Sequence, residues 1–107
     1  MQETTPLKPA DFHILLALAA GPRHGYEIMK EVDRESGGTV RLEVGTLYRI
    51  LARLLDDGLL EEADGDGRRR NYCLTRLGRR ALKQEAERLA GVVERLRARK
   101  LLPHSEA

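Results

Sequence analysis

The chain has 107 residues, enough for one domain, and 19 basic residues nearly balance 17 acidic ones to give a formal net charge of +2. No apolar run approaches the roughly 20 residues of a membrane-spanning helix, and the first residues lack the basic start and apolar stretch of a secretion signal. The single cysteine, Cys73, excludes an intramolecular disulfide and a CxxC metal site. We therefore expect a globular, helix-rich protein of a reducing cytoplasm, with no membrane partner.

The basic residues are concentrated in the C-terminal part of the chain. Residues 64–80 contain six arginines and two aspartates, a net charge of +4, whereas residues 1–63 carry a net charge of −4. Fifteen of the nineteen basic residues are arginine, which a GC-rich coding bias would also produce, but such a bias does not explain their clustering. Local charge of this kind attracts an anionic partner more strongly than the small net charge suggests.

Two helices are predicted in the first third of the chain. Pro9 suits the first turn of a helix, and residues 10–20 are apolar on almost every side, which predicts a helix that is largely buried. A second helix is expected to begin at His24 and to end at the Ser-Gly-Gly of residues 36–38. Its apolar face is predicted to contain Tyr26, Met29 and Val32. We expect His24 to cap this helix or to pack beside Tyr26 rather than to act as a pH sensor or ligand.

A third helix is predicted most clearly, over Gly45–Leu55. Its apolar residues recur at the spacing of a single core-facing stripe: Leu47, Ile50, Leu51, Leu54 and Leu55. At about 100° per residue, the opposite face carries small or basic side chains. These are Gly45, Arg49 and Ala52, with Thr46 and Arg53 on the flank. This face is free of bulky apolar groups, so it has room to approach another molecule closely.

A hairpin is predicted after Gly58. Residues 59–63 and 70–74 are typical of short strands, and the repeated Asp-Gly of residues 64–67 between them is a strong hairpin signal. Three arginines follow the turn, namely Arg68, Arg69 and Arg70. The hairpin therefore carries positive charge at its tip.

A long final helix is predicted after Thr75, which is a favourable N-cap residue. Its apolar residues step by four and three, as in a coiled-coil seam: Leu82, Ala86, Leu89, Val93 and Leu96. We interpret residues 75–102 as a dimerisation helix that continues from a DNA-binding domain at residues 9–74, both within one compact unit.

Three helices, a hairpin and a final helix follow the order of a winged helix-turn-helix, a mainly α fold with a small β-hairpin. In that fold the third helix enters the major groove of DNA, and the hairpin lies along the phosphates or in the adjacent minor groove. Arg49 and Arg53 would reach guanine edges or phosphates, and Thr46 lies where a helix N-terminus favours a phosphate. The pattern alone leaves an alternative open, an ordinary helical domain with a solvated basic face.

Three motifs stand in order along residues 9–82: HGYEIMKEV, GTLYRILARLLDDGLLEE and the hairpin into YCLTRLGRRAL. Together they resemble the PadR-type transcriptional regulators, particularly the short members with a single C-terminal helix. The resemblance implies a homodimeric winged-helix repressor that pairs through its last helix with help from the first. It places the recognition helix on Gly45–Leu55, with Thr46, Tyr48 and Arg49 facing DNA, and the wing on Asp64–Arg70.

The chain departs from many of these relatives at two places. Glu43-Val44 replaces a small polar residue and a proline, and Arg49 stands where several relatives have proline. A carboxylate is favourable beside a helix N-terminus but unfavourable near phosphates, which leaves the role of Glu43 open. We expect Arg49 to carry specificity particular to this chain.

No catalytic constellation is visible in the sequence. Cys73 is either a thiol switch or a small spacer on a strand, and we favour the spacer. The acidic pairs Asp56-Asp57 and Glu61-Glu62 have no neighbouring nucleophile or base and are typical of solvated charge. Three scattered histidines and one cysteine have no metal-ligand spacing. We therefore expect no enzyme activity, no metal and no cofactor.

The sequence predicts a regulator that binds double-stranded operator DNA as a homodimer, at an inverted repeat. A small hydrophobic effector stays open as a further partner: short relatives hold flat compounds between aromatic side chains in the dimer interface, but the C-terminal helix here has no aromatic residue. The runner-up interpretation is a protein–protein adaptor that does not read DNA. A third, weaker one is an enzyme that uses Cys73 or His24.

Overall fold

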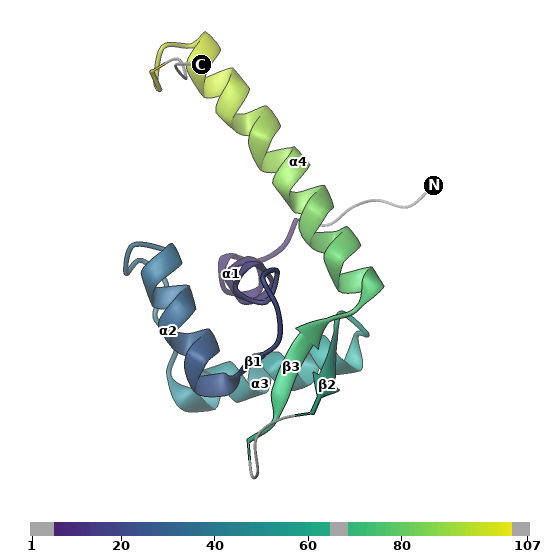
Figure 1. Ribbon diagram of the computed structural model, residues 1–107. Coiled ribbons are helices and arrows are strands. Elements are labelled where there is room, and N and C mark those ends of the chain that lie inside the picture. Colours follow the sequence, from purple (N-terminus) through teal and green to yellow (C-terminus); the bar gives the residue numbers. More distant parts are fainter. Residues whose placement is uncertain (1–5, 65–68, 104–107) are drawn as a thin grey trace.

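The computed structural model describes residues 6–64 and 69–103 (Figure 1). Its elements, in chain order, are α1 (Pro9–Ala17), β1 (Arg23–His24), α2 (Gly25–Glu35), α3 (Val44–Asp56), β2 (Leu60–Ala63), β3 (Asn71–Leu74) and α4 (Arg76–Ala98). The strands form one antiparallel sheet in the order β1-β3-β2. This arrangement confirms the predicted mainly α winged-helix fold with a small β-hairpin.

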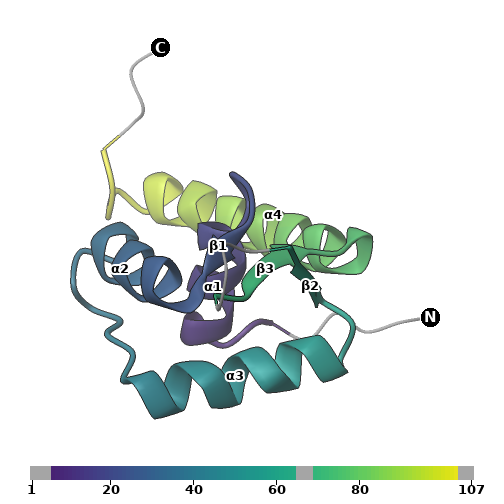
Figure 2. The same cartoon turned by 60° about the horizontal axis from the view of Figure 1, so that its bottom comes forward.

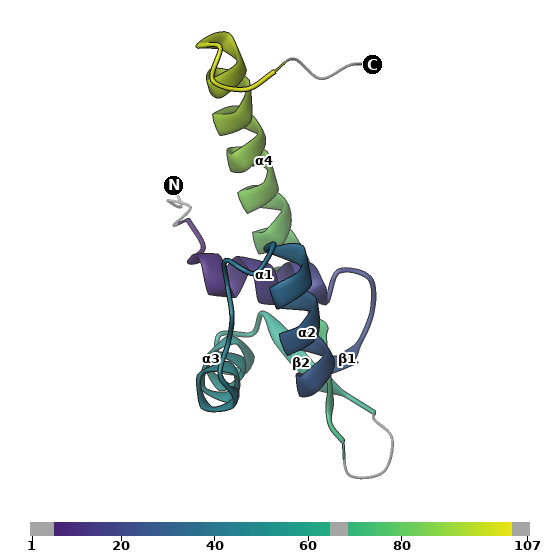
Figure 3. The ribbon, with the colours of Figure 1, turned by 90° about the vertical axis from the view of Figure 1, so that its left-hand side faces the viewer.

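The molecule has two distinct ends. Helix α4 passes over α1, and its C-terminal half extends away from the other elements (Figures 1 and 3). Helix α3 and the hairpin lie at the opposite end, and Figure 2 shows α3 running along that side below α1 and α2. The elements predicted to touch DNA are therefore far from the free half of α4.

The core is formed mainly by aliphatic side chains of α1, α2 and α3. Its largest fully buried members are Ile14, Leu15, Leu18, Ile28, Val32, Leu47, Leu51 and Leu54. The predicted core-facing stripe of α3 is confirmed, because four of its five residues are buried and Leu55 is half-buried. Each fully buried Leu or Ile contributes about 1.5–3 kcal/mol, so this stripe fixes the orientation of α3 and leaves its opposite face in solvent.

Helix α1 ends at Ala17, three residues before the end of the apolar segment 10–20. The chain turns through residues 18–21, where Gly21 has a φ of +148°. The Nε of Arg23 donates a hydrogen bond to the Ala17 carbonyl oxygen at 2.7 Å. This hydrogen bond satisfies the carbonyl group of the last helical residue, whereas the apolar composition of residues 18–20 predicted that the helix would continue through them.

Strand β1 is an element that the sequence analysis did not predict. Its two residues pair with β3, Arg23 opposite Tyr72 and His24 opposite Asn71. Two residues are too few to show a period, so only the pairing defines this strand. This pairing holds the start of α2 against the hairpin.

Helix α2 begins with a capping box at His24. The Nδ1 of His24 accepts a hydrogen bond from the backbone N–H of Glu27, and the Glu27 carboxylate accepts one from the His24 N–H. This confirms the prediction that His24 caps the second helix. The predicted apolar face of α2 was wrong at Tyr26, which is 65% exposed, because the buried residues of α2 are Gly25, Ile28 and Val32.

Helix α4 begins with a close backbone contact. Thr75 Oγ1 accepts a hydrogen bond from the Gly78 N–H at 3.0 Å and donates one to the Gly58 carbonyl oxygen at 2.6 Å. A Cβ atom at Gly78 would overlap the Leu59 carbonyl oxygen. Only glycine fits there, which gives a physical reason for the Leu-Thr-x-x-Gly element of the sequence.

The N-terminal half of α4 packs on the core of the chain itself. Its buried residues are Gly78, Leu82 and Glu85, and Leu82 is only 9% exposed. Leu82, the first residue of the predicted pairing seam, is covered in the single chain by the chain's own core. Further along the predicted seam, Ala86 is exposed and the last three residues, Leu89, Val93 and Leu96, are half-buried. Among the described helices, none is long and apolar enough to cross a membrane.

Candidate nucleic-acid interface

The exposed face of α3 contains half of the residues predicted to touch DNA. Gly45 and Arg49 are exposed, Tyr48 is 47% exposed, and Thr46 is half-buried. A Cβ atom at Gly45 would meet no other atom within 4 Å, so the space beside the first turn is open. This face combines hydrogen-bonding side chains with room for close approach, which a helix in the major groove requires.

Arg53 lies on the flank of α3 and has a partner within the chain. Its Nη2 donates a hydrogen bond to Oδ1 of Asp11 on α1 at 2.8 Å, and this bond raises the pKa of the Arg53 guanidinium. Asp11 is 5% exposed, whereas the Arg53 side chain is 45% exposed. The guanidinium is therefore held at α1, with its remaining N–H groups available to another partner.

The hairpin presents two described arginines, and Arg68 lies outside the described residues. Arg70 Nη1 lies 3.1 Å from Oε1 of Glu62 on the neighbouring strand. Arg69 Nη1 lies 3.2 Å from Nε2 of His24 at the start of α2. Both arginines are exposed. The contact with His24 directs Arg69 toward the start of α2, whereas the contact with Glu62 directs Arg70 toward β2, on the other side of β3.

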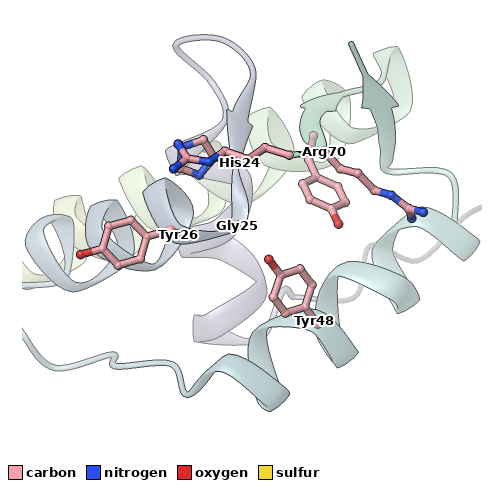
Figure 4. Close-up of a pocket in the computed structure, with 7 residues that line it drawn as sticks. His24, Gly25, Tyr26, Tyr48 and Arg70 are labelled. Carbon is pink, nitrogen blue, oxygen red and sulfur yellow. The ribbon is translucent and has the colours of Figure 1, made fainter. Parts of the chain in front are cut away.

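A pocket of about 380 Å³ lies where α2, α3 and β3 meet, and we call it the tyrosine hollow (Figure 4). It is lined by His24, Gly25, Tyr26, Tyr48, Arg69, Arg70 and Tyr72. Figure 4 shows Tyr48 pointing from α3 toward Gly25. A Cβ atom at Gly25 would overlap the Tyr48 hydroxyl, so the glycine permits this approach. All three tyrosines of the chain line this one hollow.

The tyrosine hollow is rich in hydrogen-bond donors. Tyr72 is only 5% exposed, and burial, with smaller effects of Tyr48 and Glu62, raises the pKa of its phenol. Its hydroxyl therefore stays protonated near neutral pH and can donate. Arg69 and the first residues of α2, Gly25 and Tyr26, also line this region, and the α2 N-terminus favours negative charge. Such a donor set suits phosphate oxygens.

Cys73 has the surroundings of a structural residue rather than those of a reactive thiol. Cys73 is half-buried on β3 with its Sγ 3.8 Å from Oε1 of Glu61, and burial raises the pKa of its thiol. A raised thiol pKa is the opposite of what a reactive cysteine needs. Within residues 6–64 and 69–103, no group of three His, Cys, Asp or Glu side chains is arranged to hold a metal ion.

Residues 14–84 match the family described as the transcriptional regulator PadR-like family. The chain belongs to the PadR-like family of transcriptional regulators. The match includes all of α2, α3, the hairpin and the first turns of α4, which are the elements that build the surface described above. The family is one of transcription regulators, in agreement with the function expected from the sequence.

This PadR-like chain also resembles individual proteins. It is 43% identical over 81 residues to an uncharacterised 37.1 kDa protein in transposon TN4556 of Streptomyces fradiae, a match that covers 76% of this chain and 23% of that protein. It is 28% identical to the transcriptional regulator YqjI of Escherichia coli over 80% of this chain and 42% of YqjI. The chain thus spans less than half of the length of the curated relatives that it matches.

Two solved structures show the same fold. A transcriptional regulator from Clostridium thermocellum has a TM-score of 0.68 and 29% identity, over 83% of this chain and 87% of that one. Bacillus subtilis PadR, solved in complex with operator DNA, has a TM-score of 0.64 and 20% identity, over 94% of this chain and 50% of that one. At 20% identity the second likeness concerns the fold alone.

Sequence reasoning missed four residues of the tyrosine hollow: His24, Gly25, Tyr26 and Tyr72. The three tyrosines are separated by more than twenty residues each, and no spacing rule brings them together. The pairing of β1 with β3 does so, because it places the start of α2 beside the hairpin. The His-Gly-Tyr motif was the available signal, since a glycine inside a helix start marks a close approach.

Proposed function

We propose that this PadR-like chain is a homodimeric repressor that binds an inverted-repeat operator through α3 and the hairpin. The observation that carries the proposal is the position of Tyr48. It belongs both to the exposed face of α3 and to the tyrosine hollow, so the two form one surface. This surface lies at the end of the molecule opposite the free half of α4 (Figure 1).

The face of α3 would enter the major groove. Gly45 lets the helix approach the base edges, Arg49 reaches guanine O6 and N7 or a phosphate, and Thr46 bonds a phosphate near the helix N-terminus. Arg53, oriented by Asp11, would use its free N–H groups on the backbone of the DNA. Tyr48 would lie at the edge of the groove, where its hydroxyl reaches the same backbone.

The tyrosine hollow would seat one phosphate group beside the groove. Arg69, the protonated Tyr72 hydroxyl and the N-terminal end of α2 lie around one space and would supply the hydrogen-bond donors. The remaining hairpin arginines, Arg68 and Arg70, would continue along the phosphates or into the adjacent minor groove. Such contacts fix the register of the protein on DNA without reading sequence.

The free half of α4 would pair with a second copy of the chain. Leu89, Val93 and Leu96 are only half-buried in the single chain, and Ala86 beside them leaves room for close packing. In this arrangement residues 9–74 form the DNA-binding part and residues 75–102 the dimerisation helix. A two-fold dimer would present its two α3 helices to successive major grooves, about 34 Å apart. Bacillus subtilis PadR, which has the same fold, was solved in complex with operator DNA, and this supports operator DNA as the partner.

Selection of bound genomic fragments, followed by titration of one fragment, tests the proposal. Neutralisation of about six to eight phosphates per dimer predicts that log K falls with log salt at a slope of roughly −5 to −7. Arg49→Ala should cost about 1–3 kcal/mol on the selected fragment and much less on scrambled DNA. Arg99→Ala, at the far end of α4, is the matched control and should change neither the affinity for the selected fragment nor that for scrambled DNA. A salt slope near zero, or no selected fragment at all, would favour the protein–protein adaptor.

Fluorine NMR tests the phosphate seat separately. With 3-fluorotyrosine in place of tyrosine, the chain gives three resonances, and all of them come from the tyrosine hollow. Addition of the selected fragment should shift all three, whereas DNA itself contributes no fluorine signal. If only the Tyr48 resonance shifts, α3 binds DNA without occupation of the hollow.

A further inference from the structure

Glu43 occupies an unusual place on the proposed DNA surface. It is the N-cap residue of α3, exposed, with φ −79° and ψ 157°, and its side chain accepts no hydrogen bond from the first turn. It has no ion-pair partner among the residues that the structure describes. The next side chain, Val44, is apolar and 60% exposed. A free carboxylate therefore stands at the end of α3 that leads into the groove.

The carboxylate of Glu43 does not serve α3 as a cap. The N-cap side chains of α2 and α4, His24 and Thr75, each accept a hydrogen bond from a backbone N–H of the first helical turn. Only a through-space effect on the helix dipole is left for Glu43, worth about 0.3–1 kcal/mol at an exposed position. That small gain is opposed by repulsion from DNA phosphates when α3 is bound.

The chemistry of the major groove decides which partner a carboxylate can accept from. Among base edges there, only the amino groups of cytosine (N4) and adenine (N6) donate hydrogen bonds. In a base pair the adenine amino group lies between two acceptors, its own N7 and the O4 of thymine, and both repel a carboxylate. The cytosine amino group has only one such neighbour, the O6 of guanine. A carboxylate at this end of α3 is thus best satisfied by cytosine. The adjacent apolar Val44 reduces competition from water for that hydrogen bond.

We propose that Glu43 is a specificity-determining residue that accepts a hydrogen bond from the N4 amino group of a cytosine in each operator half-site. The inference rests on the proposed function, since it requires α3 in the major groove. It also explains why an acidic residue stands on a surface that otherwise attracts phosphate. Repulsion between Glu43 and the phosphates lowers the affinity for every DNA sequence. A hydrogen bond from cytosine offsets this loss only at sites that contain the cytosine, so the difference in affinity between right and wrong sites increases.

Selection from random DNA duplexes by the full chain tests the inference. The wild-type protein should enrich cytosine at one position of each half-site, and replacement of that base should lower its affinity about 5- to 150-fold, the range of one good base contact. E43Q should shift the preference at that position to adenine, because glutamine pairs with adenine N6 and N7. E43A should lose preference there, keep it elsewhere, and bind random DNA more tightly.

Asp56→Asn is the matched control, since it removes an exposed carboxylate from the other end of the same helix. Its base preferences should equal those of the wild type. An E43A profile identical to that of the wild type would overturn the inference and leave Glu43 as a source of repulsion only. A wild-type protein that selects no sequence would instead contradict the proposed function. Circular dichroism and thermal unfolding verify that each variant folds.

Discussion

The carboxylate of Asp11 on α1 accepts a hydrogen bond from Arg53 on α3 across 42 positions of sequence, with 2.8 Å between Oδ1 and Nη2. The two partners differ in exposure, because Asp11 is buried and Arg53 is nearly half exposed. Helix α1 also packs on α4. The pair therefore fixes one end of the proposed reading helix to the helices that would hold the dimer together.

Because Asp11 is buried and Arg53 is exposed, removal of either side chain should lower the stability of the fold by a different amount. Arg53→Ala leaves a buried carboxylate without a partner and should destabilise the fold by about 2–4 kcal/mol. Asp11→Ala leaves a guanidinium that water can solvate and should cost less, about 0.5–1.5 kcal/mol. Urea unfolding of both variants and of the double variant measures this. If Asp11→Ala is the more damaging change, the burial of the carboxylate is not what makes the pair important.

The close contact of Gly25 with Tyr48 predicts that a substitution at Gly25 lowers DNA affinity but hardly changes the stability of the fold. A methyl group at Gly25 would displace the Tyr48 ring, which can swing into solvent because Tyr48 is 47% exposed. The free energy of unfolding of Gly25→Ala should therefore lie within about 1 kcal/mol of the wild-type value, because the substitution strains only a side chain that can move. Its affinity for the selected DNA should fall by about 1.5–3 kcal/mol, the value of a hydrogen bond to a charged group.

The effect of Gly25→Ala should disappear in a Tyr48→Ala background, because the displaced ring is then absent. Titration of both single variants and the double variant with the same DNA measures the coupling. Equal losses from Gly25→Ala in the two backgrounds would show that the glycine acts through something other than Tyr48.

The sequence predicted the helices and the hairpin well because their signals are local. The stripe of α3, the Asp-Gly turn and the Thr75 cap each depend on neighbouring residues, and all but the tip of the hairpin lie in the described part of the chain. The order of elements then defined the winged-helix fold. The four-and-three spacing also identified one side of α4 on which Leu82 is buried and Leu89, Val93 and Leu96 are half-buried.

Other features depend on which element covers which, and periodicity does not contain that information. Leu82 belongs to the apolar stripe of α4, but only the fold shows that α1 and its neighbours cover it. Asp11 is of a residue type that is usually exposed, but in the structure it is buried and pairs with Arg53. The tyrosine hollow depends on β1, a strand too short to have a pattern. Contacts between distant segments thus account for most of what was missed.

Leu89 tests the pairing of α4 with a second copy. Leu89→Glu would place a charge in an apolar seam, where an unpaired carboxylate is costly, and should convert the dimer to monomer. Gln84→Glu adds the same charge at an exposed position of the same helix and is the control. Sedimentation velocity distinguishes the two species. If the Leu89→Glu variant still sediments as a dimer, the dimer interface does not include this part of α4.

Glu85 predicts a pH-dependent part of the stability. Its carboxylate is only 4% exposed and accepts hydrogen bonds from Nε and Nη2 of Arg88 at 3.0 and 2.7 Å. These bonds, with a backbone hydrogen bond from Leu7, hold the pKa of Glu85 below its ordinary value against the opposite effect of burial. The charged form is thus favoured by folding, so its contribution is present above the unfolded pKa and is lost as pH falls through the folded one.

Glu85→Gln should therefore be less stable than the wild type at pH 7, by about 1 kcal/mol or more, since it loses a charge-assisted pair. The difference should shrink as the pH falls below about 4, where the unfolded carboxyl is protonated. Glu94→Gln is the control, because that side chain is 74% exposed and its pair with Arg97 is solvated. Urea unfolding between pH 7 and pH 3 gives both curves. A difference that grows toward acid would have the wrong sign for this account.

Binding to operators with altered spacing tests the central claim most directly, namely that a symmetric dimer reads two half-sites with its paired α3 helices. The selected inverted repeat is compared with the same half-sites separated by five additional base pairs, about half a helical turn, and with a scrambled duplex. We predict that the added spacing lowers the affinity by several orders of magnitude, close to the value for scrambled DNA, because the second helix then faces the wrong side of the duplex. Equal affinity for all three duplexes would contradict the account.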